Sequence, residues 1–493
     1  MSLTRRYFLK SAAVIGAAAS VRHEIHAQET KQSSSPNEKM GAAVVGTGGR
    51  GGAHIAALLK RSDAELRYVC DADLDHAGKA AKSIESKGAK APQVERDFRR
   101  ILDDPSIDII SIATPNHWHS LHAIQALQAG KHVYVEKPVS HNVWEGRQLV
   151  GWARHTGKMC QAGTQSRSSD SLKEAVEYVQ SGKLGKIQYA IGTCYKPRPS
   201  IGKLDKPLQI PASVDYDLWC GPAAMVDLYR PKLHYDWHWD FNTGNGDMGN
   251  QGIHQMDIAR WFLGEQELSP LIASIGGRVG YDDAGDTPNT QIAYHGYEKA
   301  PLIFETRGLP SKNLDYKSGM DKYRGSQVGI IVQCENGYVV VPSYTQATAF
   351  DNSGKQIEQW TVKGDANDRH FANLFDAIRS GKYQDLNGEI LEGHLSSALC
   401  HTGAISHILG APKKGTEIEK EVADNKLWKD SYDRMAQHLA ANGVDISDPK
   451  LHVGPWLKMD PKTERFTNSE AANKLLTREY RKGYEVPEAP KAV

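Results

Sequence analysis

The chain has 493 residues, which is longer than one hydrophobic core usually supports, so we expect two domains. Its 60 lysines and arginines against 59 aspartates and glutamates leave a formal net charge of +1. This balance excludes a strong field for holding nucleic acid or an anionic membrane surface, and it favours a small neutral ligand.

Residues 1–39 are predicted to form an export signal and a polar linker. Residues 4–10 (TRRYFLK) contain paired arginines and precede an apolar run, residues 11–21, and a small-residue exit at residues 25–27, a pattern typical of a twin-arginine signal. The apolar run is shorter than the roughly 20 residues that span a bilayer. We expect export by the twin-arginine machinery and a periplasmic location, with membrane association if the signal stays uncleaved. The alternative is a disordered basic tail or a short anchor.

Residues 40–163 alternate short apolar runs with helical stretches, which predicts repeated βαβ units and a parallel sheet. The candidate strands are residues 42–45, 66–70, 107–113 and 132–135. Residues 120–129 repeat leucine or isoleucine at three-residue steps and stop at Gly130, as expected of a helix that covers the sheet. This region is predicted to be a Rossmann domain, an α/β fold with a doubly wound parallel sheet.

Residues 164–425 lose that alternation and contain longer β-rich stretches, followed by helical ones. The β-rich stretches are residues 187–195, 291–307 and 327–341, and the helical ones are residues 369–381 and 392–409. We predict a second, α+β domain with a large open, mostly antiparallel sheet that serves substrate binding and oligomerisation. The charged, amphipathic residues 426–493 are predicted to form a helical extension.

A glycine-rich loop follows the first predicted strand directly. It reads Gly46-Thr47-Gly48-Gly49-Arg50-Gly51 and leads into a helical pattern. The glycines permit a tight turn, and the start of the helix offers free N–H groups to a pyrophosphate, which indicates dinucleotide binding. Asp71 follows Gly51 by 20 residues, the spacing of a carboxylate that binds the adenosine ribose. Asp71 and the nearby Asp73 would repel a 2′-phosphate, which favours NAD over NADP, although Arg50 could pair with such a phosphate.

Three further motifs follow the loop. One predicted strand runs into residues 113–119 (ATPNHWH), the next runs into residues 135–138 (VEKP), and residues 250–257 read NQGIHQMD. With the glycine-rich loop, this order resembles the family of glucose-fructose oxidoreductase and inositol dehydrogenase, called Gfo/Idh/MocA, over residues 40–409. The resemblance implies a Rossmann domain that binds a nicotinamide cofactor and a site for a sugar.

Carried onto this chain, the resemblance assigns catalytic roles to Lys137 and His254, which would face the nicotinamide and the sugar. Asn250 stands where the family motif has an aspartate, so the division of acid and base roles stays open. Glu136 is expected beside the nicotinamide ribose, and Gln165 near the carboxamide end. The residues expected along the cofactor are Thr114, Pro115, Asn116 and His119.

The residue types also suit acid–base chemistry. Oxidation of a carbon that bears a hydroxyl requires a base for the hydroxyl proton. At the carboxyl end of a parallel strand, Lys137 would be desolvated and close to the positive nicotinamide, and both effects lower its pKa. The alternative for Lys137 is a surface lysine. His254 opens an apolar helix and could point into the crevice, or it could be a cap or a core histidine. Asp257, one turn later, could orient it.

Residues 233–241 (LHYDWHWDF) are dense in histidine, acidic and aromatic groups. They could bind a metal, but alternation at period two would place the aromatic groups on one face, for core packing or for stacking on a sugar. No metal site is predicted.

The six cysteines are widely spaced and are expected to be buried thiols, with Cys194 and Cys220 the pair to check for a disulfide. The candidate substrate contacts are Lys137, Arg167, Lys196, Arg198, Trp237, Asn250, His254 and Asp257, with His401 a weaker one.

An exported enzyme cannot exchange its nicotinamide cofactor with the cytoplasm, so we expect NAD to be loaded before export and held tightly. The main hypothesis is an NAD(H)-dependent oxidoreductase that acts on a hydroxyl of a sugar or sugar derivative. The first alternative is an NAD-dependent glycosidase that oxidises C3 transiently, eliminates the leaving group, adds water and reduces the product again. The second is a sugar-binding module that holds NAD without catalysis. Homo-oligomers are expected, and a nucleic-acid partner is not.

Overall fold

The computed structural model describes residues 39–490, so the predicted twin-arginine signal lies outside the described residues. The chain divides into two units, residues 1–33 and 34–493, and all described residues lie in the second unit. Within residues 39–490, no helix combines the length and the apolar character needed to cross a bilayer.

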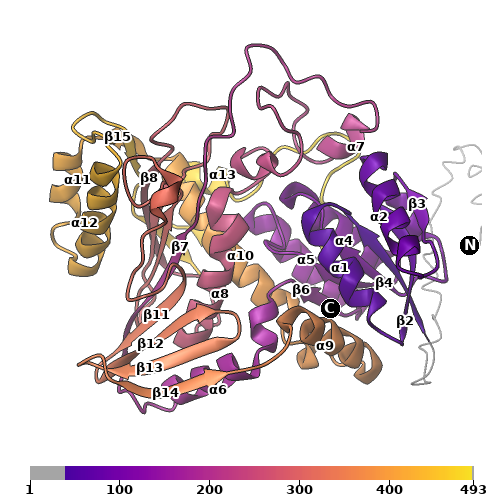
Figure 1. Ribbon diagram of the computed structural model, residues 1–493, viewed down its shortest axis with the longest axis horizontal. Helices are drawn as coiled ribbons and strands as arrows, with labels where there is room; N and C mark the ends of the chain where they lie inside the picture. Colours follow the sequence, from indigo (N-terminus) through magenta and orange to yellow (C-terminus); the bar gives the residue numbers. More distant parts are fainter. Residues whose placement is uncertain (1–38, 491–493) are drawn as a thin grey trace, which may run out of the picture. The chain divides into compact units, whose positions relative to one another are not determined.

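The amino-terminal domain is built on a six-stranded parallel sheet with the order β3-β2-β1-β4-β5-β6 (Figure 1). The strands are β1 (Met40–Val45), β2 (Ala64–Cys70), β3 (Gln93–Glu95), β4 (Ile109–Ile112), β5 (His132–Val135) and β6 (Cys160–Ala162). The strand order reverses between β1 and β4, where the carboxyl ends of the strands open a crevice for a ligand. The predicted Rossmann domain is therefore confirmed.

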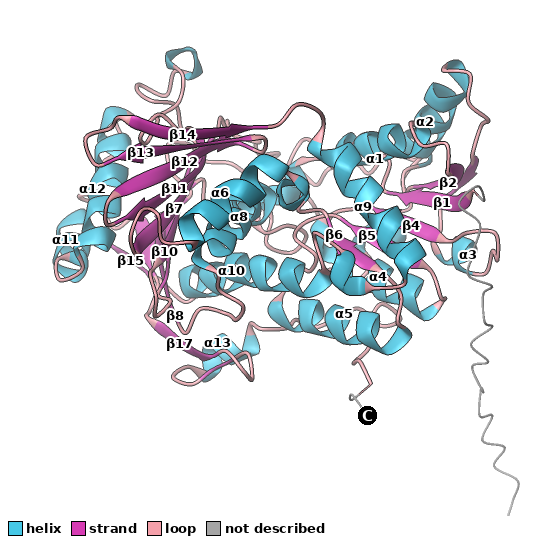
Figure 2. Ribbon diagram, turned by 90° about the horizontal axis from the view of Figure 1, so that it is seen from below, coloured by secondary structure: helices cyan, strands magenta, loops and turns pink. Residues whose placement is uncertain are grey.

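Helices cover both faces of this sheet (Figure 2). One face carries α1 (Gly49–Leu59), α2 (Leu74–Ser86) and α9 (Ala366–Ser380), and the other carries α3 (Arg99–Leu102), α4 (His119–Gln128) and α5 (Val143–Thr156). Helix α9 comes from far along the chain, and its Phe371 stacks on Tyr134 of β5 with ring centroids 4.3 Å apart. The Rossmann core thus includes a helix that lies outside residues 40–163.

The second domain is built on a 12-stranded, mostly antiparallel sheet, which confirms the predicted fold class. The main order is β14-β13-β12-β11-β7-β10-β9-β8-β16-β15, with β17 paired to β8 and β18 paired to β17. Its strands are β7 (Ile187–Tyr195), β8 (Leu271–Gly277), β9 (Thr290–His295), β10 (Leu302–Arg307), β11 (Val328–Cys334), β12 (Gly337–Ser343), β13 (Gln346–Asp351), β14 (Gln356–Thr361), β15 (Ala411–Lys413), β16 (Leu451–Val453), β17 (Leu457–Asp460) and β18 (Arg465–Phe466). Strands β7 and β10 run parallel at its centre.

Two helical layers sandwich this sheet. One layer consists of α6 (Asp170–Gln180), α8 (Ile253–Leu263) and α10 (Ile390–Ile408), and the other consists of α11 (Gly415–Val422) and α12 (Lys426–Ala441). Residues 426–493, predicted to be helical, contain α12 and the short α13 (Glu470–Lys474) but also β16, β17 and β18. Their short apolar runs add strands to the sheet edge instead of continuing the helix.

Residues 197–247 form a long connection with little regular structure, which we name the covering segment. Its regular elements are α7 (Tyr216–Cys220) and a 3-10 turn, Asp236–Trp239. The period-two alternation predicted for residues 233–241 is therefore wrong, because Tyr235 has a positive φ of 66° that ends any extended run before the turn.

The covering segment lies against the amino-terminal domain at the turn between β2 and α2. The N–H of Asp215 donates to the carbonyl of Ala72 (2.9 Å), and the N–H of Leu74 donates to the carbonyl of Ser213 (3.1 Å). At the neighbouring strand end, the indole N–H of Trp118 donates to the carbonyl of Leu218 (3.0 Å). These contacts hold the covering segment over the carboxyl edge of the parallel sheet.

Candidate active site

The glycine-rich loop joins β1 to α1 at the carboxyl edge of the sheet. Gly46 has a φ of +82°, and a Cβ on it would lie 2.6 Å from the backbone of Ala113. A Cβ on Gly51 would lie 1.9 Å from the carbonyl oxygen of Gly46. Both positions therefore require glycine for the close turn. Gly49, by contrast, faces open space, and the first turn of α1 has no side-chain cap, so its N–H groups are free for a pyrophosphate.

Asp71 closes the other side of this loop at the end of β2. Its Oδ2 accepts hydrogen bonds from the N–H (2.8 Å) and the hydroxyl (3.1 Å) of Thr47, and its Oδ1 accepts one from the N–H of Asp73 (3.0 Å). The carboxylate is thus fixed beside the loop, in the place where an adenosine ribose binds in a Rossmann domain. The residues present fit an NAD molecule at its adenosine and pyrophosphate end.

A cavity of about 420 Å³ runs along the carboxyl edge from Asp71 to Asn250. The covering segment lines it with Trp219, Trp237 and His238, and residues 475–490, which we name the C-terminal stretch, contribute Tyr484. The predicted cofactor residues that line it are Gly46, Gly48, Gly49, Arg50, Asp71, Thr114, Pro115, Asn116, His119, Glu136 and Lys137. The structure therefore brings most of the predicted cofactor residues together in one groove.

Glu136, at the end of β5, is the centre of a buried polar network. Its Oε1 accepts from Nε of Arg50 (2.6 Å) and from Nε2 of Gln165 (3.1 Å), and it lies 3.1 Å from Nε2 of His54. Burial disfavours the charged form, but Arg50 and His54 hold the pKa of Glu136 well below its usual range. Arg50 also donates to the side-chain carbonyl of Asn367 (2.7 Å). The guanidinium of Arg50 thus binds Glu136 and Asn367 and is not directed at an adenosine 2′-phosphate.

His54 and Asn367 are functional neighbours that the sequence reasoning missed. His54 lies on the buried face of α1, and Asn367 is in the first turn of α9. A polar residue on the apolar face of the helix after the loop was the available signal for His54. No sequence signal indicated that α9 returns to this site.

Lys137 follows Glu136 and faces the second domain. Its Nζ donates to the backbone carbonyl of Asn250, 2.7 Å away. Burial is the main cause that lowers the pKa of Lys137, and the positive charges of Arg50 and Lys196 lower it further, while Glu136 opposes them. Lys137 can therefore exchange a proton at a lower pH than a free lysine.

His254 lies in the first turn of α8, directly after a π-helical turn, Met248–Gly252, that contains Asn250. The side chain is 7% exposed, and its ring centroid lies 5.1 Å from that of Tyr344. Burial, followed by the charge of Lys137, lowers the pKa of His254 to about 3. Its ring makes no hydrogen bond to any residue of the described part of the chain, and His254 is not among the residues that line the cavity.

Asp257 does not orient His254 as the sequence suggested. Its carboxylate accepts two hydrogen bonds from Nε of Arg167 (2.9 and 3.0 Å) and one from the hydroxyl of Ser396 (2.7 Å). A second carboxylate, Glu392, lies 3.1 Å from Arg167. This ion cluster is buried behind α8, so Arg167 and Asp257 support the helix that carries His254 and do not line the cavity.

The other predicted substrate residues divide in the same way. Trp237 lines the cavity and stacks on His238 with ring centroids 3.6 Å apart. Lys196 reaches Oε1 of Gln251 at 3.4 Å, close to the Lys137 end. Arg198 instead forms a buried two-bond ion pair with Asp247 (2.7 and 3.0 Å).

His401, a predicted substrate contact, and the six cysteines are all buried. His401 lies 3.1 Å from the hydroxyl of Ser140 and is buried. All six cysteines are free and buried, Cys194 and Cys220 included.

Two family models match the chain. Residues 40–164 match the model described as "Oxidoreductase family, NAD-binding Rossmann fold", and residues 179–363 match "Oxidoreductase family, C-terminal alpha/beta domain". Together they cover more than half of the chain, one on each of the two sheets described above. The amino-terminal domain is therefore an NAD-binding Rossmann domain.

Two curated relatives resemble shorter parts of the chain. "Glycosyl hydrolase family 109 protein 1" of Shewanella sp. (strain MR-4) is 30% identical over 178 residues, which cover 32% of this chain and 39% of the relative. "Levoglucosan dehydrogenase" of Pseudarthrobacter phenanthrenivorans is 24% identical over 200 residues, 40% of this chain and 43% of the relative. The chain thus matches less than half the length of either relative.

Among solved structures, the WlbA dehydrogenase of Bordetella pertussis, in complex with NADH and UDP-GlcNAcA, is similar with a TM-score of 0.53. The match covers 73% of this chain and 94% of that one, at 19% sequence identity. It shows that the two chains share a fold.

Proposed function

The chain belongs to the Gfo/Idh/MocA family of oxidoreductases, and on this basis we propose that it oxidises or reduces a hydroxyl-bearing carbon of a sugar or sugar derivative with tightly held NAD. The observation that carries the proposal is the position of Lys137. An amine with a lowered pKa stands at the carboxyl end of β5, in the same cavity as the glycine-rich loop.

Bound NAD would accept a hydride from the hydroxyl-bearing carbon, which leaves a carbonyl group. Lys137 supplies the accompanying proton chemistry: its amine can take the hydroxyl proton during oxidation and return it during reduction. The carbonyl of Asn250 fixes the direction of this amine. Glu136 stays ionised and accepts a hydrogen bond from the backbone N–H of Lys137 (3.1 Å), which fixes the start of the side chain.

His254 is the second candidate acid–base group. Because its pKa is lowered to about 3, the imidazole is neutral at physiological pH and can accept a hydrogen bond, although it is a weaker base than a free histidine. The family aspartate at position 250 would have made the imidazole more basic. Asn250 has no carboxylate charge and does not have this effect. We therefore assign the hydroxyl proton to Lys137 and propose that His254 accepts a hydrogen bond or a proton from a neighbouring sugar position.

The enclosure of the cavity supports tight cofactor binding. The covering segment and the C-terminal stretch are joined above it, because Asp217 accepts a hydrogen bond from the hydroxyl of Tyr484 (2.7 Å) and forms an ion pair with Arg481. These contacts lie beside a cavity that is partly open to solvent, so they would hinder, and not block, the release of a cofactor. Asp71, fixed by Thr47, favours NAD over NADP because it would repel a 2′-phosphate.

The second candidate is an NAD-dependent glycosidase. It is favoured by the 30% identity to a family 109 glycosyl hydrolase. Transient oxidation at C3 would acidify the C2 proton, which His254 could remove as the leaving group departs. Water would then add to the double bond, and reduction of the ketone would return NAD to its oxidised form. This cycle needs no second redox substrate, which suits a protein that keeps its cofactor.

We also propose that the protein is exported by the twin-arginine machinery and acts in the periplasm as a homo-oligomer. The paired arginines in residues 4–10 support export, and the edge strands β13 and β14, which α11 and α12 do not cover, supply a surface for assembly. Export of the folded chain would carry the loaded cofactor along.

One set of measurements separates the hypotheses. Purified protein is denatured and its released nucleotide identified by mass spectrometry, and native protein is incubated with glycosides and with free sugars while leaving-group release and cofactor absorbance are followed. Conversion of one sugar coupled to a second supports the oxidoreductase, and glycoside cleavage without net reduced cofactor supports the glycosidase. Sugar binding without either reaction would contradict both and leave a non-catalytic sugar-binding module.

A further inference from the structure

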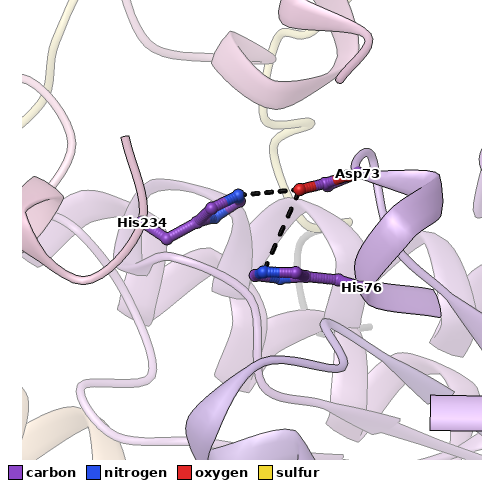
Figure 3. Close-up of side chains that lie close together, drawn as sticks. All are labelled: Asp73, His76 and His234. Atoms are coloured by element: carbon purple, nitrogen blue, oxygen red, sulfur yellow. Dashed lines mark hydrogen bonds and ion pairs between the residues drawn. The ribbon is translucent and has the colours of Figure 1, made fainter. Parts of the chain in front are cut away.

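Three side chains with metal-ligating atoms converge where the covering segment meets the amino-terminal domain. Asp73 precedes α2, His76 lies in its first turn, and His234 belongs to the covering segment. Figure 3 shows the two imidazoles directed at the carboxylate of Asp73. One ligand atom from each residue lies within 4.8 Å of the others. Two separate parts of the chain therefore supply one compact donor set.

The distances within this cluster suit a small divalent ion. Oδ2 of Asp73 lies 2.9 Å from Nε2 of His234 and 3.9 Å from Nε2 of His76. Zinc bonds of about 2.0–2.2 Å place tetrahedral ligands about 3.3–3.6 Å apart, between these two values. The donor atoms of the two histidines lie within 4.8 Å of each other, so shifts of about an ångström or less would place all three donors around one ion.

The carboxylate of Asp73 is already oriented for such a role. Its Oδ1 accepts a hydrogen bond from the N–H of Asp75 (3.0 Å) as the cap of α2, and its own N–H donates to Oδ1 of Asp71 (3.0 Å). These neighbours fix Asp73, as outer partners do for metal ligands, while Oδ2 faces the histidines. The Asp73 side chain is 6% exposed, whereas those of His76 and His234 are 29% and 36% exposed, so an ion could enter.

The two imidazole rings lie close together, although only one of them is hydrogen-bonded to Asp73. The rings of His76 and His234 lie with centroids 4.0 Å apart and planes tilted by 32°. His234 is within hydrogen-bonding distance of Asp73, but His76, at 3.9 Å, is beyond it. An ion between the three groups would give His76 a partner and would hold two close imidazoles together. Two imidazoles and one carboxylate form a donor set of borderline softness, which zinc and cobalt accept.

We propose that Asp73, His76 and His234 bind a divalent transition-metal ion of the zinc class, with water in the fourth position, and that this ion fastens the covering segment over the cofactor cavity. Both histidines line that cavity at its Asp71 end. The inference does not depend on which reaction the protein catalyses. The sequence predicted no metal site. The reason is that His234 lies 161 residues from Asp73, so no sequence spacing could indicate that they meet.

The test uses the full chain without an affinity tag, treated with a chelator and then titrated with Co²⁺ and Zn²⁺. Cobalt binding is read from its visible absorption, and zinc stoichiometry from elemental analysis after dialysis. We expect one ion per chain. Loss of an outer partner already weakens metal binding by about 10–100-fold, so His76→Ala and His234→Ala should each weaken it by more than about 100-fold.

Two further variants make the test specific. Asp73→Asn keeps a good helix cap but removes the anionic ligand, so α2 should stay folded while metal affinity falls. His155→Ala removes an exposed histidine at the end of α5 and should change nothing. Equal cobalt affinity in His234→Ala and in the unchanged chain would overturn the site. If the metal binds as expected but does not slow NAD release, its fastening role is overturned.

Discussion

The amine of Lys137 donates a hydrogen bond to the backbone carbonyl of Asn250 across the boundary between the two domains. This contact joins the two motifs that carry the chemistry, one at the end of β5 and the other in the turn before α8. It uses the backbone of residue 250, so it is compatible with asparagine or aspartate there.

Replacing Lys137 with methionine should abolish most of the activity while NAD stays bound. The change keeps a long aliphatic side chain but removes the amine that moves the hydroxyl proton, and such groups contribute about 10²–10⁴-fold to rate. Turnover is compared with the NAD content of the same preparation. Unchanged turnover, at full NAD content, would remove Lys137 from the mechanism.

Replacing Lys196 with glutamine should shift the pH dependence of the reaction. The charge of Lys196 contributes to the lowered pKa of Lys137, so its removal raises that pKa. A base with a higher pKa loses its proton at higher pH, and the rising limb of kcat/KM should move upward in pH. If KM rises and the limb does not move, Lys196 contacts substrate and does not tune Lys137.

The site was predictable where its residues follow directly from a strand. The carboxyl ends of parallel strands meet at one edge of the sheet, so the loop, Asp71 and Lys137 could be placed together from their positions after β1, β2 and β5. Local sequence was sufficient there because each residue is fixed by its own strand.

The rest of the site depends on contacts between distant parts of the chain. Asn367 binds Arg50 across 317 residues, and His234 meets Asp73 across 161 residues. The covering segment has no periodicity that would indicate what it packs against. Residues 233–241 show the limit of pattern analysis, since their alternation suggested a strand and the positive φ of Tyr235 produces a turn.

Replacing Arg167 with alanine should destabilise the protein more than it affects substrate binding. The change leaves the carboxylate of Asp257 buried without its main partner, and breaking such a pair costs about 3–5 kcal/mol. The double variant Arg167→Ala, Asp257→Asn should lose less than the sum of Arg167→Ala and Asp257→Asn alone, as measured by chemical unfolding. An increase in KM without loss of stability would instead make Arg167 a substrate contact.

Replacing His295 with leucine should stabilise the protein, most strongly in acid. Both ring nitrogens of this buried histidine lack a hydrogen-bond partner in the described part of the chain, and burial lowers its pKa to about 3. The unfolded chain binds a proton near pH 6.5 and the folded chain does not, so stability is lost as pH falls from 6.5 toward 3.

The leucine variant removes this loss. It should gain about 1–3 kcal/mol at neutral pH, from the unsatisfied nitrogens, and about 1.4 kcal/mol more for each pH unit below 6.5. Urea unfolding at pH 7 and pH 5 measures both parts. An equal gain at the two pH values would contradict the proposed pKa.

Replacing Tyr484 with alanine should accelerate NAD release. The tyrosine lines the cavity, and its hydroxyl donates a hydrogen bond to Asp217 in the covering segment. Its ring packs edge-on against Trp118 with ring centroids 5.6 Å apart. Its loss opens the contact between the C-terminal stretch and the covering segment, and an exposed hydrogen bond of this kind contributes about 0.5–1 kcal/mol.

Because Asp217 and this hydrogen bond are exposed, we expect a release rate about two- to fivefold faster. Release is followed by dilution into an excess of a labelled dinucleotide, with Tyr383→Ala, an exposed tyrosine outside the cavity, as the matched control. If both variants release NAD at the rate of the unchanged chain, the C-terminal stretch does not retain the cofactor, and the covering segment alone must explain any tight binding.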